Sequence, residues 1–126
     1  MKIELAGGKA TLALDSRGIL QLKWRPGSIL EAVDAEEAAI AVRRLSGNEM
    51  RPLMVEMVDI SVTSGARQVL LGTRKVVAVA LVGGTAVDRV VASALQRNRN
   101  YDQAFFTSTE SALEWLAQHP GSGREE

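Results

Sequence analysis

Seven apolar residues, Val76 to Val82, form an unbroken hydrophobic run that is followed by a helical pattern. The run is rich in β-branched valine and too short to cross a membrane, which is typical of a strand buried on both faces of a parallel sheet. Gly83 and Gly84 end this run, and Thr85 can cap the next helix with its hydroxyl. Apolar positions then recur every three to four residues and predict a core-facing stripe: Val87, Val90, Val91, Ala94 and Leu95.

The amino-terminal third has a different pattern, in which apolar and polar residues alternate. Residues 2–6, 10–14 and 20–25 alternate in this way, and Gly7-Gly8 and the segment 15–18 can form the turns between them. Alternation with period two indicates strands that have one buried and one solvated face. We therefore expect an antiparallel meander at this end of the chain.

Helical and strand patterns then alternate through the rest of the sequence. Asp34 is expected to cap a helix that ends at Gly47-Asn48, and the apolar run 53–60 predicts a second central strand. The remaining expectations are a short helix in 61–72 that Thr63 or Ser64 caps, a strand at 103–107, and a last helix that starts with a Thr107/Glu110 capping box. This order predicts an α/β fold with a mixed sheet that is antiparallel at its amino-terminal end.

Length and composition predict one domain with no cofactor. A chain of 126 residues is long enough to bury a core, so we assign residues 1–119 to a single domain and 120–126 to a flexible tail. Cysteine is absent, which excludes disulfides, thiolate nucleophiles and cysteine-ligated metals. No apolar stretch approaches the length of a membrane span, and the amino end lacks a signal-peptide core. We expect a cytoplasmic protein.

Charge is balanced overall but concentrated locally. Between residues 61 and 100 the only acid is Asp88, whereas the basic residues are Arg67, Arg74, Lys75, Arg89, Arg97 and Arg99. A nucleic-acid site is not expected, because no aromatic residues are interleaved and no known motif is present. A solvated helical face explains the pattern, and a complementary acidic surface on a second copy is an alternative.

Four stretches of the sequence resemble the SpoIIAA-like group of the STAS-type superfamily: RPLMVEM, GARQVL, VAVALVGGTAVDRVVA and AFFTSTESALEWL. The similarity covers essentially the whole chain and is greatest to a small actinobacterial subgroup of STAS-like proteins. It implies a mixed sheet with about four helices packed mainly on one face, and it assigns no activity.

The resemblance also implies a modification site. STAS domains that antagonise anti-sigma factors carry an Asp-Ser-Ser-Gly-Leu type of turn, in which a serine that heads a helix is phosphorylated. The matching stretch is residues 62–66, so Ser64 is the implied phosphoacceptor, although the preceding acid and the following branched residue are missing. A phosphate there would lie on free helix amides and near Arg67. In the alternative interpretation, Thr63 and Ser64 are ordinary N-caps.

Other candidate chemistry has a structural alternative in each case. Gly83-Gly84-Thr85 could bind an anion at a helix start, but it lacks both complete phosphate-loop patterns, so we favour a turn and a cap. Arg67 and Arg89 could jointly hold a carboxylate or phosphate, or they could lie along helix faces and pair with acids such as Asp59 and Asp88. His119 is the only histidine, and no metal site is expected.

Two functions remain open. The first is a non-enzymatic STAS-like regulatory or protein-interaction domain, a homodimer, that acts through Thr63, Ser64, Arg67, Thr85 and Arg89. The second is a carrier of a small apolar or anionic ligand, such as a lipid-like or phosphate-bearing molecule. An enzyme ranks third, because no nucleophile and base occur in a recognisable arrangement.

Overall fold

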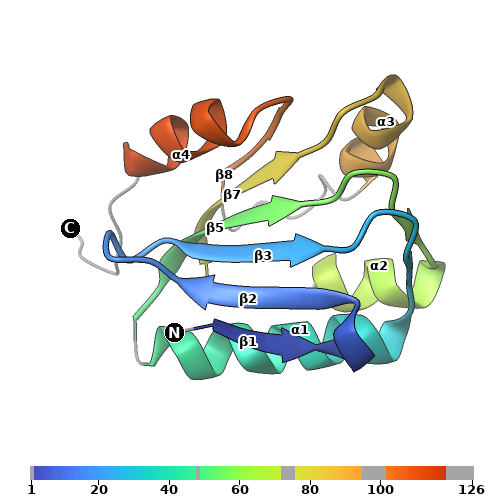
Figure 1. The fold of residues 1–126 in the computed structure, drawn as a ribbon, viewed down its shortest axis with the longest axis horizontal. Helices are drawn as coiled ribbons and strands as arrows, with labels where there is room; N and C mark the ends of the chain where they lie inside the picture. Colours follow the sequence, from blue (N-terminus) through green and yellow to red (C-terminus); the bar gives the residue numbers. More distant parts are fainter. Residues whose placement is uncertain (1, 48, 72–75, 95–101, 119–126) are drawn as a thin grey trace.

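The computed structural model describes residues 2–47, 49–71, 76–94 and 102–118, which form a six-stranded sheet, a two-stranded sheet and helices. Figure 1 shows their arrangement. The elements are β1 (Lys2–Leu5), a 3-10 turn (Ala6–Gly8), β2 (Ala10–Leu14), β3 (Leu20–Trp24), β4 (Ile29–Leu30), α1 (Ala32–Ser46), β5 (Arg51–Glu56), β6 (Ser61–Val62), α2 (Ser64–Leu71), β7 (Val76–Val82), α3 (Ala86–Ala94), β8 (Asp102–Phe106) and α4 (Thr109–Ala117).

The main sheet is mixed and has the order β1-β2-β3-β5-β7-β8. The first three strands are antiparallel, with Leu12 opposite Leu22, and β3, β5, β7 and β8 are parallel, with Met54 opposite Ala80. This confirms the predicted mixed sheet with an antiparallel amino-terminal meander. Parallel strands must be joined by crossover connections, and here these contain α2 and α3. Helix α2 follows β5 and helix α3 follows β7, so both helices begin at the same end of the sheet.

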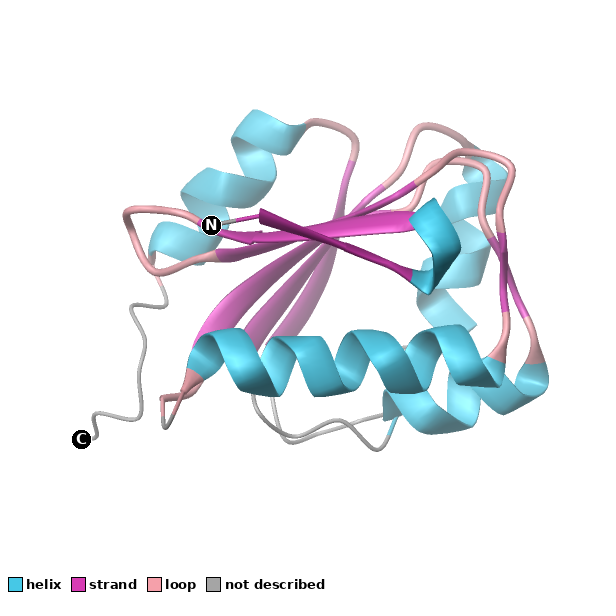
Figure 2. Cartoon of the chain, turned by 60° about the horizontal axis from the view of Figure 1, so that its bottom comes forward, coloured by secondary structure: helices cyan, strands magenta, loops and turns pink. Residues whose placement is uncertain are grey.

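Helices lie on both faces of the sheet. Figure 2 shows α1 and α2 next to each other beneath it and α4 above it. The side chains of β7 alternate accordingly, since Val79 and Leu81 belong to the cluster under α1 and α2, whereas Ala80 packs with Leu116 of α4. Ala92 of α3 joins the first cluster, so three of the four described helices pack on one face. The prediction that β7 is buried on both faces is confirmed.

Several element boundaries differ from expectation because tertiary contacts fix them. Helix α1 begins at Ala32 rather than after Asp34, which is its third residue and accepts a hydrogen bond from the Glu31 amide. The strand predicted for 53–60 is wrong in its bounds, because β5 ends at Glu56 and the chain turns before the short parallel pair β4-β6. Ser108, not Thr107, caps α4, and its Oγ accepts from the Ser111 amide at 3.1 Å.

The apolar stripe predicted for α3 is wrong at two positions. Val87 and Val90 are 70% and 69% exposed, whereas Asp88 and Ala92 are buried. The helix is thus rotated so that a carboxylate and a small residue face the protein and two valines face outward. The hydrogen bonds of Asp88 supply the physical reason for this rotation.

Candidate functional site

The side chain of Asp88 organises the loops at the carboxyl ends of β5 and β7. Its Oδ2 atom accepts hydrogen bonds from the amides of Gly84 at 2.7 Å and Thr85 at 3.1 Å. Its Oδ1 atom accepts from the amide of Asp59 at 3.0 Å, and Thr85 Oγ1 caps α3 by accepting from the Asp88 amide at 3.1 Å. One buried carboxylate therefore joins the β7–α3 turn to the loop that follows β5.

This arrangement accounts for the glycine turn before α3. The amides of Gly84 and Thr85, which could have held a phosphate, are bound to the protein's own Asp88 carboxylate. Burial by itself raises the pKa of Asp88, but hydrogen bonds from the backbone of Gly84, Asp59 and Thr85 and from the Thr85 side chain outweigh it, so the pKa lies below its usual value. The structure supports the interpretation as a turn and a cap.

Gly83 is required in this turn because of space. A Cβ atom at this position would lie 2.6 Å from Asp88 Cβ and 2.9 Å from Cε1 of Phe105. The Gly83 amide also donates to the carbonyl of Phe106 in β8 at 3.0 Å. The turn is therefore packed between α3 and the edge strand, with no room for a side chain.

Arg89 lies on the side of α3 that faces β8. Its guanidinium is 4.7 Å from the centroid of the Phe105 ring, within the range of a cation–π contact. Together with Thr85 and the exposed valines Val87 and Val90, Arg89 forms what we call the α3 start.

Thr63, Ser64 and Arg67 come together at the first turn of α2, which we call the α2 start. Thr63 Oγ1 accepts a hydrogen bond from the Ala66 amide at 3.1 Å, so Thr63 is the cap and Ser64 is the first helical residue. All three residues of the α2 start are exposed. The alternative left open between the two hydroxyl residues is thereby resolved in favour of Thr63 as the cap.

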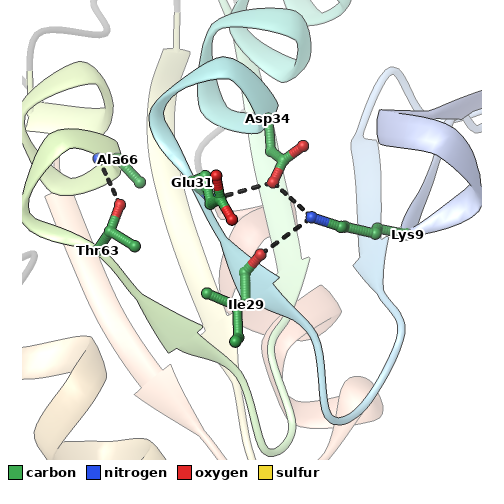
Figure 3. A network of polar contacts seen from close by, with 6 residues as sticks. All are labelled: Lys9, Ile29, Glu31, Asp34, Thr63 and Ala66. Atoms are coloured by element: carbon green, nitrogen blue, oxygen red, sulfur yellow. Dashed lines mark hydrogen bonds and ion pairs between the residues drawn. The ribbon is translucent and has the colours of Figure 1, made fainter.

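Helix α2 begins against the beginning of α1. A Cβ atom on Gly65 would lie 3.3 Å from Cβ of Ala32. Beside this contact, Lys9 Nζ donates to Asp34 Oδ2 at 2.9 Å and to the Ile29 carbonyl at 3.2 Å (Figure 3). Sequence reasoning missed the Lys9–Asp34 ion pair, which carries no local signal because 25 residues separate its members.

The predicted site residues therefore form two groups at one end of the sheet. The α2 start lies against α1, whereas Arg89 of the α3 start is directed to Phe105 of β8. The geometry gives Arg89 an aromatic partner and gives Asp88 backbone partners, so neither makes the arginine–aspartate pair that was considered. Glu56, at the end of β5, forms an ion pair with Lys23 of β3, with 3.9 Å between Oε2 and Nζ. Asp59 lies in the loop that follows β5.

An apolar cavity of about 80 Å³ lies between the sheet and the helices α1 and α2. Its helical wall contains the small residues Ala38 and Ala39, and among the described lining residues the polar one is Gln103 of β8. The other lining residues are Leu22, Trp24, Leu30, Val42, Leu53, Val55, Met57, Ile60, Val62, Leu70, Val79 and Leu81. The alanine-rich inner face of α1 leaves this space unfilled.

The described parts of the chain contain neither a cluster of metal-ligating side chains nor a membrane-spanning helix. No three potential metal-ligating side chains come together among the residues that the structure covers. None of the helices within 2–47, 49–71, 76–94 and 102–118 is long and apolar enough to cross a bilayer. His119 and the predicted tail 120–126 lie outside the described residues.

The fold resembles a solved structure closely enough to identify its class. That crystal structure is of an uncharacterized protein of the DUF3478 family, with a SpoIIAA-like fold, from Shewanella loihica PV-4. It has a TM-score of 0.63 and 15% sequence identity, over 90% of this chain and 94% of the other. The predicted SpoIIAA-like fold is thus confirmed, and the actinobacterial subgroup stays a prediction.

Sequence comparison adds the family. No curated protein matches the chain significantly. Residues 12–120, which run from β2 to beyond α4, match a family described as a domain of unknown function, DUF7793. The chain therefore belongs to the DUF7793 family and has a SpoIIAA-like fold.

Proposed function

We propose that this protein is a non-enzymatic regulatory domain that binds a protein partner through the α2 start, with phosphorylation of Ser64 controlling the contact. The observation that carries the proposal is the division of roles between two adjacent hydroxyl residues. Thr63 caps the helix, and the Ser64 side chain is exposed, with no hydrogen bond from its hydroxyl to another of the described residues. A kinase can thus modify Ser64 without removing the cap.

The chemistry around Ser64 suits a phosphate. The first turn of α2 presents the positive end of the helix dipole, and Arg67 lies one turn after Ser64 on the same helix. A phosphate adds a charge of about −1.5 to −2 and strong acceptor oxygens, so it would change the charge of this surface while favouring the helix. Partner binding would then differ between the two states of Ser64.

The α3 start supports a partner at the same end of the sheet. Val87 and Val90 are largely exposed on one side of α3, and exposed apolar side chains that lie together are a common feature of interaction surfaces. Arg89 beside them is held over Phe105 and is therefore already partly ordered. A partner that spans both helix starts would bury the two valines and contact Arg67.

Site-specific photo-crosslinking in native cells tests the proposed surface. A benzoylphenylalanine in place of Arg67 should give one crosslinked product of defined mass. The matched control replaces Glu114, an exposed residue of α4 on the opposite face of the sheet, and should give no such product. Equal products at both positions, or none at position 67, would contradict the proposal.

Phosphopeptide mass spectrometry of the same cells tests the regulatory part. We expect a phosphate on Ser64 and none on Thr63, whose hydroxyl accepts the capping hydrogen bond from the Ala66 amide, or on Ser111, whose hydroxyl accepts a hydrogen bond from the Ser108 hydroxyl. The S64D variant should change the yield of a crosslink from benzoylphenylalanine at the exposed Gln68, which leaves Arg67 in place, whereas S64A should keep the unmodified yield. If all three forms crosslink equally, Ser64 does not control the contact.

The cavity favours a second candidate function, the binding of a compact apolar ligand. The lining that the structure describes is apolar except for Gln103, and the cavity volume of about 80 Å³ is smaller than that of the roughly 150 Å³ engineered cavity that holds benzene. This size fits a small apolar molecule and leaves no room for a lipid chain unless the helices move. The anionic ligand considered from the sequence lacks a charged partner in this lining.

Thermal unfolding under xenon, which is smaller than benzene, tests this candidate. Binding to the folded state alone raises the melting temperature, and the rise grows with the ratio of free ligand to Kd. The A38V variant fills part of the cavity and should reduce the ligand effect, whereas A112V, under α4 and outside the cavity, should leave the ligand effect intact. An unchanged melting temperature for the wild-type protein at saturating ligand would rule this function out.

A further inference from the structure

The outward side of α1 carries an ordered pattern of charges that neither helix start uses. Figure 2 shows α1 along the outside of the molecule, with the sheet on its inner side. Val33 is 62% and Ile40 45% exposed, whereas Ala35, Ala38 and Val42 are buried against the core. We call the exposed side the outer face of α1, which consists of Val33, Glu36, Glu37, Ile40, Arg43 and Arg44.

Acids and bases are placed symmetrically about Ile40 on this face. Glu36 and Glu37 precede Ile40 by four and three residues, and Arg43 and Arg44 follow it by three and four. In an α-helix all four positions share a side with Ile40, one turn before it and one turn after it. The outer face thus has a negative half, an apolar centre and a positive half.

These charges have no partners within the protein that the structure describes. Acid and base lie six to eight residues apart along α1, too far for the i+3 or i+4 pairs that stabilise a helix. None of the four side chains forms an ion pair with another of the described residues.

The helix dipole explains only half of the pattern. Arginines in the last turn suit the negative end of the helix, as Arg43 and Arg44 do. Glu36 and Glu37 lie beyond the first turn, where the dipole effect has already fallen off. The dipole also gives no reason for an exposed isoleucine between the two halves.

We propose that the outer face of α1 binds the same face of a second copy of this chain in an antiparallel, twofold-symmetric pair. A twofold axis at Ile40 places the two isoleucines in contact. The same operation places Glu36 opposite Arg44 of the second copy and Glu37 opposite its Arg43, and the reverse pairs follow by symmetry. One symmetry operation therefore satisfies all the unpaired charges and covers the exposed apolar centre.

The expected dimer is weak and depends on salt. One helix face of four turns buries less area than the standard stable interface of about 800 Å² per partner. The exposed pairs that surround Ile40 are screened as ionic strength rises. The pairing leaves the α2 and α3 starts uncovered, so each dimer would present two partner surfaces, and the inference does not depend on the proposed function.

Complementary charge variants give a decisive test by sedimentation equilibrium. The E36R/E37R variant carries only bases on its outer face, and the R43E/R44E variant carries only acids. Each variant alone should dimerise about tenfold or more weakly than the wild type, because like charges face each other. An equimolar mixture should form a heterodimer at least as tight as the wild-type dimer, and this recovery excludes misfolding as the cause of the loss.

Three outcomes would overturn the inference. They are a wild-type protein that stays monomeric up to about 1 mM at low salt, a mixture of variants that stays monomeric, and a dimer that both charge reversals leave unchanged.

Disulfide trapping checks the position of the axis. The chain has no cysteine, so a single I40C substitution provides the sole thiol, and its twofold partner would lie within bridging distance. We expect rapid formation of a disulfide-linked dimer for I40C and slow formation for V90C, although Val90 is more exposed. Equal rates, or a faster rate for V90C, would place the contact elsewhere.

Discussion

The Oδ1 atom of Asp88 accepts a hydrogen bond from the amide of Asp59 at 3.0 Å, across 29 residues of sequence. Asp59 has a positive φ of 58°, a conformation that aspartate adopts more readily than most residues. Because the same carboxylate also binds Gly84 and Thr85, it fixes two crossover loops relative to each other. The position of both candidate helix starts rests on this contact.

Replacing Asp88 by asparagine is expected to destabilise the protein strongly. The amide side chain keeps one oxygen but turns an NH₂ group toward amides that need an acceptor, which costs about 2–4 kcal/mol. Urea denaturation measures the free energy of unfolding. The matched control is D59N, which keeps the backbone amide that donates to Asp88. The side chain at position 59 is exposed, and asparagine adopts a positive φ as readily as aspartate. A loss of equal size in both variants would contradict the assigned role.

The contribution of Asp88 should also depend on pH in acid. Its pKa in the folded protein is below the ordinary value of 3.8, so its stabilisation is complete above pH 3.8 and is lost as the pH falls through the folded-state pKa. Stability curves from neutral pH to strong acid should show the wild type and D88N converging below pH 3.8. A constant difference between them across this range would show that the ionised carboxylate is not what stabilises the turn.

Substitution of the two glycines before α3 by alanine should lower the free energy of unfolding by unequal amounts. G83A places a methyl group against Asp88 and Phe105 and should cost about 1–3 kcal/mol of unfolding free energy, since both neighbours are packed. G84A brings its methyl only to 3.9 Å from Asp88 Oδ2, an ordinary contact, and should stay within about 0.5 kcal/mol of wild type. Thermal unfolding of the pair checks this difference, and equal costs would refute the packing argument.

Ser46 offers a stabilising change. Its Oγ is buried at the end of α1 and has no hydrogen-bond partner among the described residues. S46A removes this unsatisfied hydroxyl and improves helix propensity, so we expect a gain of about 0.5–1 kcal/mol in unfolding free energy. The control is S93A in α3, because Ser93 is exposed and donates to the Arg89 carbonyl. If S46A loses stability, the hydroxyl has a partner in solution.

A negative charge at Ser64 should stabilise α2 rather than unfold it. The S64D variant places a carboxylate at the first helical position, beside Arg67, and should raise the unfolding free energy by about 0.3–1 kcal/mol at low salt. The gain should shrink in high salt and in the S64D/R67A double variant. A clear loss of stability in S64D would mean that any loss of partner contact reflects unfolding.

Local pattern was enough to predict much of this fold. The valine run of β7, the alternation in β2 and β3 and the alanine stripe of α1 identify their elements because their periods are set by strand and helix geometry. The element order then implies a mixed sheet, since parallel strands require helical crossovers. Thr85 was identified as a cap, and the cap of α2 was narrowed to Thr63 or Ser64, because capping acts within four residues.

Contacts between distant residues decided the rest. Periodicity placed Val87 and Val90 in the core, but the amides of Asp59 and Gly84 hold Asp88 inward and rotate the valines into solvent. The cavity depends on how far the small residues of α1 stand from the sheet, which no single element determines.

The candidate site, like the fold, was predicted from the sequence only in part. The sequence by itself placed Thr63, Ser64 and Arg67 at the start of one helix and Thr85 and Arg89 at the start of another, because a helix start is a local property. The structure then showed that Thr63 rather than Ser64 caps α2. Only the tertiary structure decided that Arg89 turns to Phe105, that Asp88 occupies the amides of the glycine turn, and that the charges of α1 lie outward. These outcomes depend on the distances between elements, and packing sets those distances only after the sheet has formed.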